Sequence, residues 1–258
     1  MRISLLQYPI IWADKEANLS LWQQRLNKLI GTTDLAVLPE MFTTGFCTDR
    51  MDLAETMDDT TVTWLKQRSA ETGLALTGSF MAAENGKKYN RAFFVTPNGD
   101  FHYADKRHLF TMGGEREYLS EGNKSLIVHY MGVNIKILVC YDLRFPVWAR
   151  NRNNEYDLLI YVANWPQARI ADWDILLPAR AVENQAYVCG VNRVGDAPGD
   201  LHYNGHSLII DPRGRVVEKL QDDQEGTLTT TIDLSLVEKG RAKFPVWKDA
   251  DQFNIITP

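Results

Sequence analysis

The sequence predicts a single domain of the α/β class, with mixed β-sheets that carry helices on their outer faces. The first indication is a strand–helix–strand opening over residues 3–38, the pattern of a sheet with crossover helices. The second is the segment 157–164 (DLLIYVAN), an unbroken apolar run typical of a strand buried on both faces. The third is a hairpin pattern that occurs at 91–106 and again at 207–217. The two copies are about 115 residues apart, which suggests two related halves.

The N-terminal half is expected to alternate strands and amphipathic helices. Strands are predicted at 3–8 and 34–38, and the helix between them is expected to be capped by Asp14. Apolar residues of that helix fall on one face at helical spacing: Leu19, Trp22, Leu26, Leu29 and Ile30. A second helix at 59–72 should end at Gly73, and strand character resumes in LALTGSF.

Each hairpin consists of an apolar run, a turn built on proline and glycine, and a second run. Pro97-Asn98-Gly99 provides the first turn and Pro212-Arg213-Gly214 the second. Four further elements are expected: a strand at 133–142, a short helix near 146–153, a helix at 171–184 and a strand at 186–194. The tail from residue 234 carries mixed signals and predicts no clear element. No linker divides residues 1–258.

Composition excludes several classes of protein. The chain has 45% hydrophobic and 24% charged residues, ordinary values for a globular protein. Its net charge of −5 argues against a nucleic-acid partner. The N-terminus MRISLLQYPI does not resemble a signal peptide, and no apolar run approaches the roughly 18 residues of a membrane helix. We therefore expect a cytoplasmic protein with no membrane partner.

The three cysteines, Cys47, Cys140 and Cys189, share no CxxC spacing, so neither a disulfide framework nor a zinc site is indicated. Cys140 stands where the apolar run of KILVCYDLRF gives way to polar residues. Cysteine is among the most often buried residue types, so Cys140 could be a filler. Reactive groups also gather at strand ends in α/β folds, so a nucleophile is the alternative, although position alone favours a structural role. Cys189 lies within a strand pattern and is interpreted as structural.

Three charged residues stand where they could take part in chemistry. Glu40 directly follows the run LAVLP, where desolvation would suit a general base, although a solvated loop position is equally open. Lys106 is bracketed by Tyr103 and Phe110 and could point into a pocket or into solvent. Glu115 lies in a long non-periodic stretch, which could form a lid or a solvated loop.

Other familiar motifs are absent: GxGxxG, GxxxxGK[ST], GxSxG and HExxH do not occur. His202 and His206 are four residues apart, but their surroundings do not read as a helix. A metal pair is therefore not expected there, and no metal site is predicted.

Three segments taken together resemble the signature of the carbon–nitrogen hydrolase (nitrilase) superfamily: LPE at 38–40, YADKRHLF at 103–110 and CYDLRFP at 140–146. The segments ARAVENQAYV at 179–188 and GHSLIIDPRGRV at 205–216 extend the resemblance over nearly the whole chain. Within the superfamily the chain is most similar to the ω-amidase group. Members of that group hydrolyse the side-chain amide of 2-oxo acids such as 2-oxoglutaramate.

The resemblance implies a four-layer αββα sandwich with pseudo-two-fold halves, a small amide substrate and no metal or organic cofactor. It also implies a homodimer or larger homo-oligomer. The Glu-Lys-Cys triad of the family falls on Glu40, Lys106 and Cys140. Its additional glutamate falls best on Glu115, because of the interval to Gly122, with Glu117 and Glu121 as nearby competitors.

The implied chemistry is hydrolysis through a thioester on Cys140, with Glu40 as the base. The Lys106 ammonium and the backbone N–H of Tyr141 would receive the negative charge of the oxyanion. Trp165 is expected to line the pocket, and Arg169 and Arg180 are candidates to bind a substrate carboxylate. A local ion pair between Asp142 and Arg144 is expected to brace the turn after Cys140.

Three alternatives remain open from the sequence. The first is a sibling enzyme with the same triad, namely a nitrilase, an N-carbamoyl amidase or an aliphatic amidase. The second is a metal-dependent αββα phosphoesterase, although the sequence lacks an evident set of Asp, His and Asn ligands. The third is a non-enzymatic binding protein on a degenerate hydrolase frame.

Overall fold

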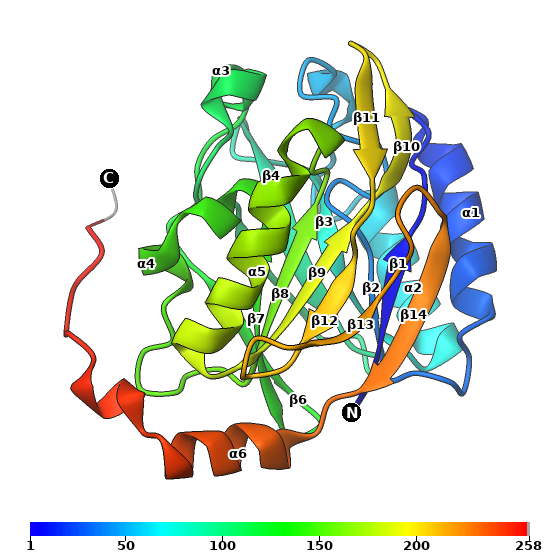
Figure 1. Ribbon diagram of the computed structural model, residues 1–258. Helices are drawn as coiled ribbons and strands as arrows, with labels where there is room; N and C mark the ends of the chain where they lie inside the picture. The colour runs from blue at the N-terminus through cyan, green and yellow to red at the C-terminus, as the bar shows by residue number, and fades with distance from the viewer. Residues whose placement is uncertain (257–258) are drawn as a thin grey trace.

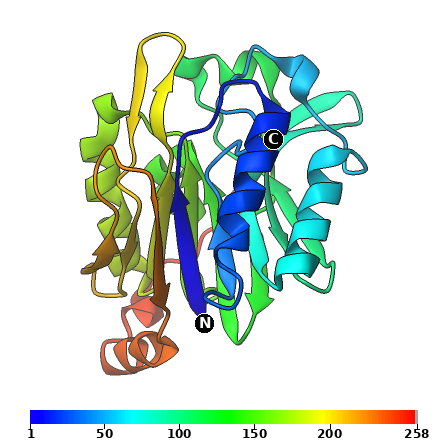
Figure 2. The same cartoon turned by 90° about the vertical axis from the view of Figure 1, so that its right-hand side faces the viewer.

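The computed structural model describes residues 1–256, and its main body is two six-stranded β-sheets packed face to face (Figure 1). Helices cover the outer face of each sheet, and Figure 2 shows α1 and α2 on the outside of the first. The order is β14-β1-β2-β3-β4-β5 in the first sheet and β13-β12-β9-β8-β7-β6 in the second. The predicted four-layer αββα sandwich is confirmed.

The strands of the first sheet are β1 (Arg2–Gln7), β2 (Leu35–Val37), β3 (Ala75–Glu84), β4 (Lys87–Val95), β5 (Phe101–Asp105) and β14 (Gly226–Thr231). Those of the second are β6 (Leu126–Tyr130), β7 (Val133–Val139), β8 (Leu158–Ala163), β9 (Tyr187–Asn192), β12 (Leu208–Ile210) and β13 (Val216–Lys219). A separate hairpin consists of β10 (Val194–Ala197) and β11 (Leu201–Asn204).

The α-helices are α1 (Lys15–Asn27), α2 (Thr60–Thr72), α3 (Glu115–Tyr118), α4 (Pro146–Ala149), α5 (Ile170–Asn184) and α6 (Leu234–Lys243). Short 3₁₀ turns are η1 (Met51–Leu53), η2 (Thr111–Gly113), η3 (Cys140–Arg144), η4 (Gln167–Arg169) and η5 (Val246–Asp249).

The two sheets repeat one topology. Strands β1, β2 and β3 run parallel and continue into the antiparallel hairpin β4–β5. Strands β7, β8 and β9 do the same and continue into β12–β13. The two hairpin patterns therefore occupy equivalent places, as the suggestion of related halves requires. The predicted central strand is β8, which is buried along its whole length between β7 and β9.

Each layer is joined to the next by its own apolar cluster. Between the sheets, side chains such as Leu5 and Val37 pack in one core with Ile135 and Ile160. Trp22 belongs to the cluster between the first sheet and its helices, and Trp173 of α5 belongs to the cluster on the second sheet. Burial of these faces, at about 25 cal/mol per Å² of apolar surface, is the main force that holds the layers together.

The helix boundaries follow the sequence signals at most places. The Asp14 side chain accepts a hydrogen bond from the backbone N–H of Ala17 (3.0 Å), so the predicted cap of α1 is confirmed. Helix α2 ends at Gly73, which adopts the left-handed conformation (φ +70°). The prediction that Ile30 belongs to the buried face is wrong: α1 ends at Asn27, and Ile30 is exposed.

Two other expectations need correction. The short helix near 146–153 stops at Ala149. The tail from residue 234 does contain an element, α6, capped by Asp233 and tied to the second sheet by an Arg241–Asp157 ion pair of 2.8 Å. Only Val237 of α6 is buried, so the apolar periodicity that reveals a helix in a sequence is missing there. Within residues 1–256, no helix has the length and apolar character to cross a membrane.

The topology brings distant segments together at one end of the sandwich, the upper end in Figure 1. Strands β2 and β5 of the first sheet and β7 and β8 of the second all point their carboxyl ends there. Glu40, Lys106, Cys140 and Asn164 lie just beyond these four ends.

Candidate active site

Cys140 stands at a strained turn directly after β7. It is the first residue of η3, and its φ of +42° lies in the left-handed region that non-glycine residues rarely adopt. Asp142 holds the turn in place: it accepts hydrogen bonds from the backbone N–H of Val139 (3.1 Å) and of His108 (3.0 Å). The His108 ring stacks on Phe145, with 3.7 Å between ring centroids. The surrounding contacts therefore fix the direction of the Cys140 side chain.

The expected ion pair between Asp142 and Arg144 is not formed. Asp142 turns back to the end of β7 and contacts the His108 ring as well (2.8 Å). Arg144 turns the other way, toward α5, where it donates to Asp172 (2.6 Å) and lies over the Trp165 ring (4.9 Å). Asp142 does brace the turn, but through backbone N–H groups rather than through Arg144.

Glu40 lies in a turn that follows β2 and stays hydrogen-bonded to β3. The N–H of Leu38 donates to Thr77, and the N–H of Met41 donates to the Ser79 hydroxyl. Met41 has a φ of +45°, so the chain turns sharply immediately after Glu40. Glu40 is fully buried.

A buried network joins Glu40, Lys106 and Glu115, none of whose side chains is exposed. The Lys106 ammonium donates to Glu40 Oε1 (3.0 Å) and to Glu115 Oε2 (2.8 Å) and Oε1 (3.1 Å). The Asn90 amide donates to the same two carboxylates, at 2.8 Å to Glu40 and 3.2 Å to Glu115. The backbone N–H of Asn164 donates to Glu40 Oε2 (2.8 Å). Both carboxylates are thus stabilised by one ammonium and by N–H donors.

Glu115 is brought to Lys106 because the stretch that carries it closes on itself. The backbone N–H of Phe110 donates to Glu115 Oε2 (2.7 Å), and the N–H of Gly122 donates to the Lys106 carbonyl (2.8 Å). A Cβ at Gly122 would lie 2.0 Å from the Asp105 carbonyl oxygen, so no side chain fits there. The alternative that Glu115 is a solvated loop acid is wrong.

The neighbouring glutamates lie elsewhere. Glu117 is exposed, and Glu121 pairs with Arg116 (3.4 Å) and Arg107 (3.8 Å). Of the three glutamates weighed from the sequence, only Glu115 contacts Lys106 within the described part of the chain.

Electrostatics at the site set the resting protonation of the thiol. Burial raises the pKa of the Cys140 thiol well above its ordinary value, and the nearby Glu40 carboxylate adds to this more than Lys106 opposes it. Burial also raises the pKa of Glu115, against the attraction of Lys106. Burial alone would lower the pKa of Lys106, but the Glu115 and Glu40 carboxylates outweigh it and raise the pKa. At neutral pH Cys140 is therefore a thiol beside a charged ammonium, and a base would have to accept its proton for the sulfur to act as a nucleophile.

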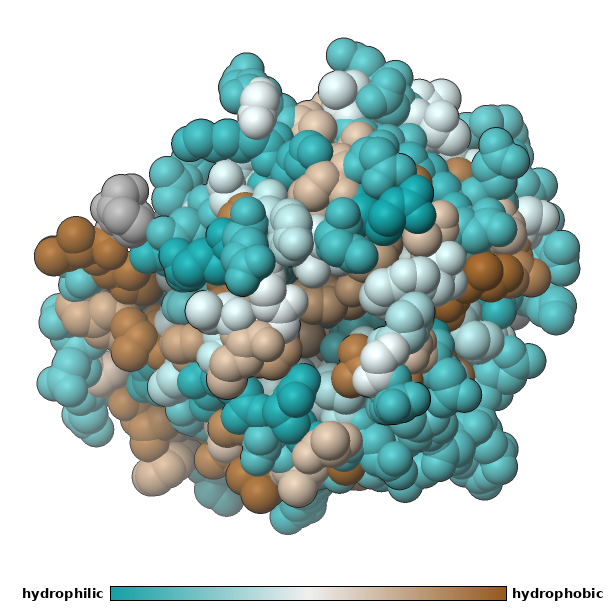
Figure 3. Space-filling view, turned by 90° about the horizontal axis from the view of Figure 1, so that it is seen from above, coloured by the Kyte–Doolittle hydropathy of each residue, from teal (hydrophilic) through white to brown (hydrophobic). Residues whose placement is uncertain are grey.

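A cavity of about 670 Å³ opens onto these groups, with Lys106, Cys140, Tyr141, Trp165 and Arg169 in its lining. Figure 3 looks onto this end of the molecule: hydrophilic side chains dominate, and residues of intermediate hydropathy, white to light brown, lie toward the middle. Arg180 does not reach the cavity, because its side chain is buried and donates to the Leu143 carbonyl (2.6 Å).

Sequence reasoning missed two asparagines of the network. The Asn164 side chain donates to the Glu40 carbonyl (2.7 Å), which fixes the turn that carries this carboxylate. Asn164 ends the apolar run 157–164, and that strand-end position was a signal that could have found it. Asn90 lies within β4 and had no signal, because only the pairing with β5 places it beside Lys106.

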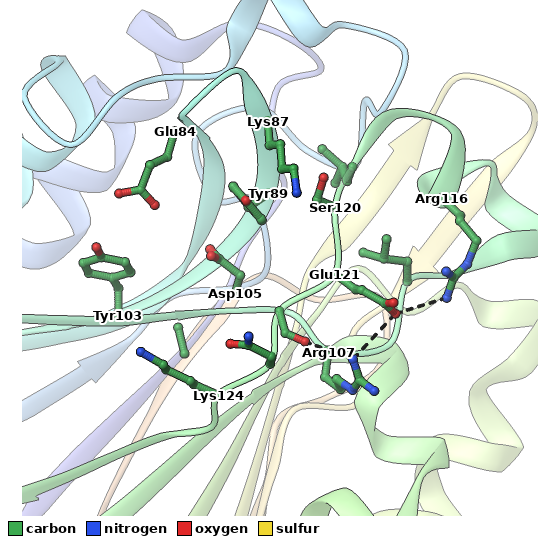
Figure 4. Close-up of a pocket in the computed structure, with 15 residues that line it drawn as sticks. Glu84, Lys87, Tyr89, Tyr103, Asp105, Arg107, Arg116, Ser120, Glu121 and Lys124 are labelled. Carbon is green, nitrogen blue, oxygen red and sulfur yellow. Dashed lines mark hydrogen bonds and ion pairs between the residues drawn. The ribbon is translucent and has the colours of Figure 1, made fainter. Parts of the chain in front are cut away.

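A second cavity, of about 730 Å³, is lined by chain neighbours of Lys106 and Glu115 but by neither of these side chains. Figure 4 shows its charged lining, with Arg107 and Arg116 both directed at Glu121. No cysteine contributes to its lining, whereas Cys140 lines the first cavity.

The remaining candidates stay apart from the site. Cys189 is fully buried within β9, and Cys47 is buried as well. His202 contacts Asp196 and Asp223 (2.6 Å each), whereas His206 contacts Asp174 (3.0 Å). Across residues 1–256, no group of three or more His, Cys, Asp or Glu side chains is arranged to hold a metal ion.

Comparisons with known proteins match this chain to carbon–nitrogen hydrolases over nearly its whole length. The family model "Carbon-nitrogen hydrolase" matches residues 2–242. Omega-amidase YafV of Escherichia coli K12 is 42% identical over 255 residues, which cover 99% of this chain and 98% of that protein. The 2-oxoglutaramate amidase of Bacillus subtilis is 34% identical over 252 residues, 96% of each chain. The crystal structure of XC1258 from Xanthomonas campestris, a CN-hydrolase superfamily protein, is 42% identical with a TM-score of 0.96 and covers 99% of this chain and 98% of its own.

Proposed function

The chain belongs to the carbon–nitrogen hydrolase family, and we propose that it is an ω-amidase acting on a small 2-oxo dicarboxylic acid monoamide, such as 2-oxoglutaramate or 2-oxosuccinamate. It releases the dicarboxylic acid and ammonia through a thioester on Cys140. The observation that carries the proposal is the buried Glu40–Lys106–Glu115 network beside Cys140, in a chain 42% identical to an ω-amidase. Residues 1–258 act as one catalytic domain in this proposal.

Acylation begins when Glu40 takes the proton of the Cys140 thiol while the sulfur attacks the amide carbon. Such concerted transfer suits a thiol whose pKa burial has raised, because a free thiolate is scarce at neutral pH. Negative charge develops on the amide oxygen. The Lys106 ammonium and the N–H of Tyr141 stabilise it, since the first N–H groups of a helical turn lack an intrahelical acceptor.

Glu40 then gives its proton to the amide nitrogen, the C–N bond breaks, and ammonia leaves a thioester on Cys140. Water attacks this thioester while Glu40 accepts one of its protons. The C–S bond breaks, the proton returns to the sulfur, and the dicarboxylic acid leaves. Glu115 contacts Lys106 and positions its ammonium throughout the cycle.

The charge of the cavity favours an anionic substrate. Lys106, Arg144 and Arg169 line it, whereas no acidic side chain of the described residues does. A 2-oxo dicarboxylic monoamide carries one carboxylate, and guanidinium groups bind carboxylates in two-pronged geometry. The aromatic wall formed by Tyr141 and Trp165 contacts the carbon chain of the substrate in this proposal.

Ammonia release from a panel of substrates tests the proposed specificity. We expect kcat/KM for 2-oxoglutaramate to exceed that for an uncharged aliphatic amide by about 10- to 10²-fold, since one bound carboxylate supplies about 1.5–3 kcal/mol. Activity should be unchanged in excess EDTA. A higher kcat/KM for a nitrile or an N-carbamoyl amino acid would make the chain a sibling enzyme, and loss of activity in EDTA would revive a metal-dependent hydrolase.

We further propose that the protein is a cytoplasmic homodimer or a larger homo-oligomer. Free thiols at all three cysteines suit a reducing compartment. Ile175 and Val182, seven residues apart on α5, are both exposed apolar residues. Leu236 and Phe244, of α6 and its end, are exposed as well and line a cavity of about 530 Å³ together with Val182. A second copy that covers this apolar face would remove it from water.

A charge on this face should split the dimer. Val182→Glu is expected to convert the protein from dimer to monomer, because an interfacial carboxylate without a partner costs several kcal/mol. Light scattering after size-exclusion chromatography gives the mass directly. Ile30→Glu, at an exposed apolar residue after α1, is the matched control and should leave the mass unchanged. A wild-type protein that elutes as a monomer would contradict the proposed dimer.

A further inference from the structure

The three cations that line the substrate cavity differ in their partners. Lys106 is shared between two buried carboxylates. Arg144 forms an ion pair with Asp172 (2.6 Å). Arg169 contacts no carboxylate at ion-pair distance within residues 1–256, and its guanidinium lies over the Phe110 ring, 5.0 Å from the centroid. Arg169 is therefore the cation of this lining whose charge the protein leaves unbalanced.

The structure holds Arg169 in place without using its charge. Its carbonyl accepts a hydrogen bond from the Trp165 indole (2.8 Å), and it ends η4 directly before α5. The N-terminal end of a helix as long as α5 carries partial positive charge, which adds to that of the guanidinium. Asp172, the acidic residue in the first turn of α5, is occupied by Arg144.

The Phe110 ring connects Arg169 to the chemistry. Phe110 packs against Tyr141 (5.1 Å between centroids), the residue that follows Cys140. The cation–π contact with Phe110 restrains the guanidinium, while its N–H groups donate to no carboxylate of residues 1–256. Arg169 thus lines the same cavity as the Cys140 thiol, and the rings of Phe110 and Tyr141 line it as well.

We propose that Arg169 binds the substrate carboxylate remote from the scissile amide and thereby selects anionic ω-amides over neutral ones. This inference deepens the proposed function of the same cavity and rests on it. Arg169 already lies over the Phe110 ring and has no ion pair with a carboxylate of residues 1–256, so a two-pronged contact with a ligand costs little reorganisation.

Kinetics of Arg169→Met test the role. For 2-oxoglutaramate we expect KM to rise about 10- to 100-fold with a smaller change in kcat, because a charge-assisted contact to a non-reacting group is lost. For an uncharged aliphatic amide both constants should stay within about twofold of the wild type. Arg169→Lys should give an intermediate KM, since it keeps the charge but not the fork. The matched control is Arg152→Met, at an exposed arginine outside the cavity lining.

If Arg169→Met lost the same factor of kcat/KM on the anionic and on the neutral amide, the inference would be overturned, because Arg169 would then have a structural role. A binding measurement separates it from the proposed activity. Calorimetry of 2-oxoglutarate binding to Cys140→Ala protein needs no turnover. Adding Arg169→Met to this protein should raise the Kd at least tenfold, and adding Arg169→Lys should raise it to an intermediate extent. An unchanged Kd would overturn the role of Arg169 even if ω-amidase activity were found. Weakened binding would support it even if the physiological amide were different.

Discussion

Replacing Cys140 by alanine is expected to lower kcat by about 10⁴-fold or more on every amide that the wild type hydrolyses. In the proposed mechanism the sulfur both attacks the amide and carries the acyl group, so no neighbouring side chain can replace it. Binding and the oxyanion donors would remain and would account for any residual rate. Glu40 and Lys106 keep their partners in this variant, so the fold should be retained.

Two measurements identify Cys140 as the reacting thiol. Mass spectrometry of wild-type protein quenched in acid during turnover should show one acyl group, on the peptide that carries Cys140, and none in Cys140→Ala. Cys189→Ala is the matched control: burial raises the pKa of that thiol too, but it lies within β9 among apolar residues, so activity should persist. Unchanged hydrolysis by Cys140→Ala would refute the thioester mechanism.

Replacing Lys106 by methionine is expected to abolish measurable turnover and to lower the free energy of unfolding by about 3–5 kcal/mol at pH 8. The ammonium contacts both Glu40 and Glu115, and neither side chain is exposed to water. Methionine fills a similar volume but leaves two carboxylates buried without a counter-charge. The loss in kcat should be about 10³-fold or more, because in the proposed mechanism the oxyanion loses its charged donor as well.

The pH dependence of that destabilisation has a definite sign. The pKa of Glu115 is already raised by burial, and loss of Lys106 removes the main interaction that lowers it. A carboxyl group whose folded-state pKa is raised disfavours folding when it must ionise, so its penalty is largest above the folded-state pKa and fades as pH falls. The difference in free energy of unfolding between wild type and Lys106→Met should therefore be smaller at pH 5 than at pH 8.

Urea denaturation at the two pH values measures this difference directly. Lys28→Met is the matched control, since Lys28 is exposed at the end of α1. It should change the free energy of unfolding by no more than about 0.5 kcal/mol and the activity by no more than about twofold. A loss of stability in Lys106→Met that is the same at pH 5 and pH 8 would show that the buried carboxylates are not its cause.

The sequence by itself determined the features that depend on neighbours in the chain. The unbroken apolar run of β8 requires burial on both faces, and the two proline–glycine turns require hairpins, so these elements followed from local patterns. Strands β6, β10, β11 and β14 were not predicted. Glu40, Lys106 and Cys140 could be singled out because each follows a strand-like run, and strand ends in α/β folds gather at one edge. Helix α6 was missed because a helix with one buried residue has no apolar period.

Only the tertiary structure decided which charges meet. Asn164 contacts Glu40 across 124 positions of the chain, and no local pattern reports such a pair. Arg144 and Asp142 are two residues apart, yet their partners come from α5 and from His108. Apolar periodicity records which face of an element is buried, because burial repeats along the chain. The partner of a buried charge is set by a single contact between distant segments, so it becomes known only when the layers are packed.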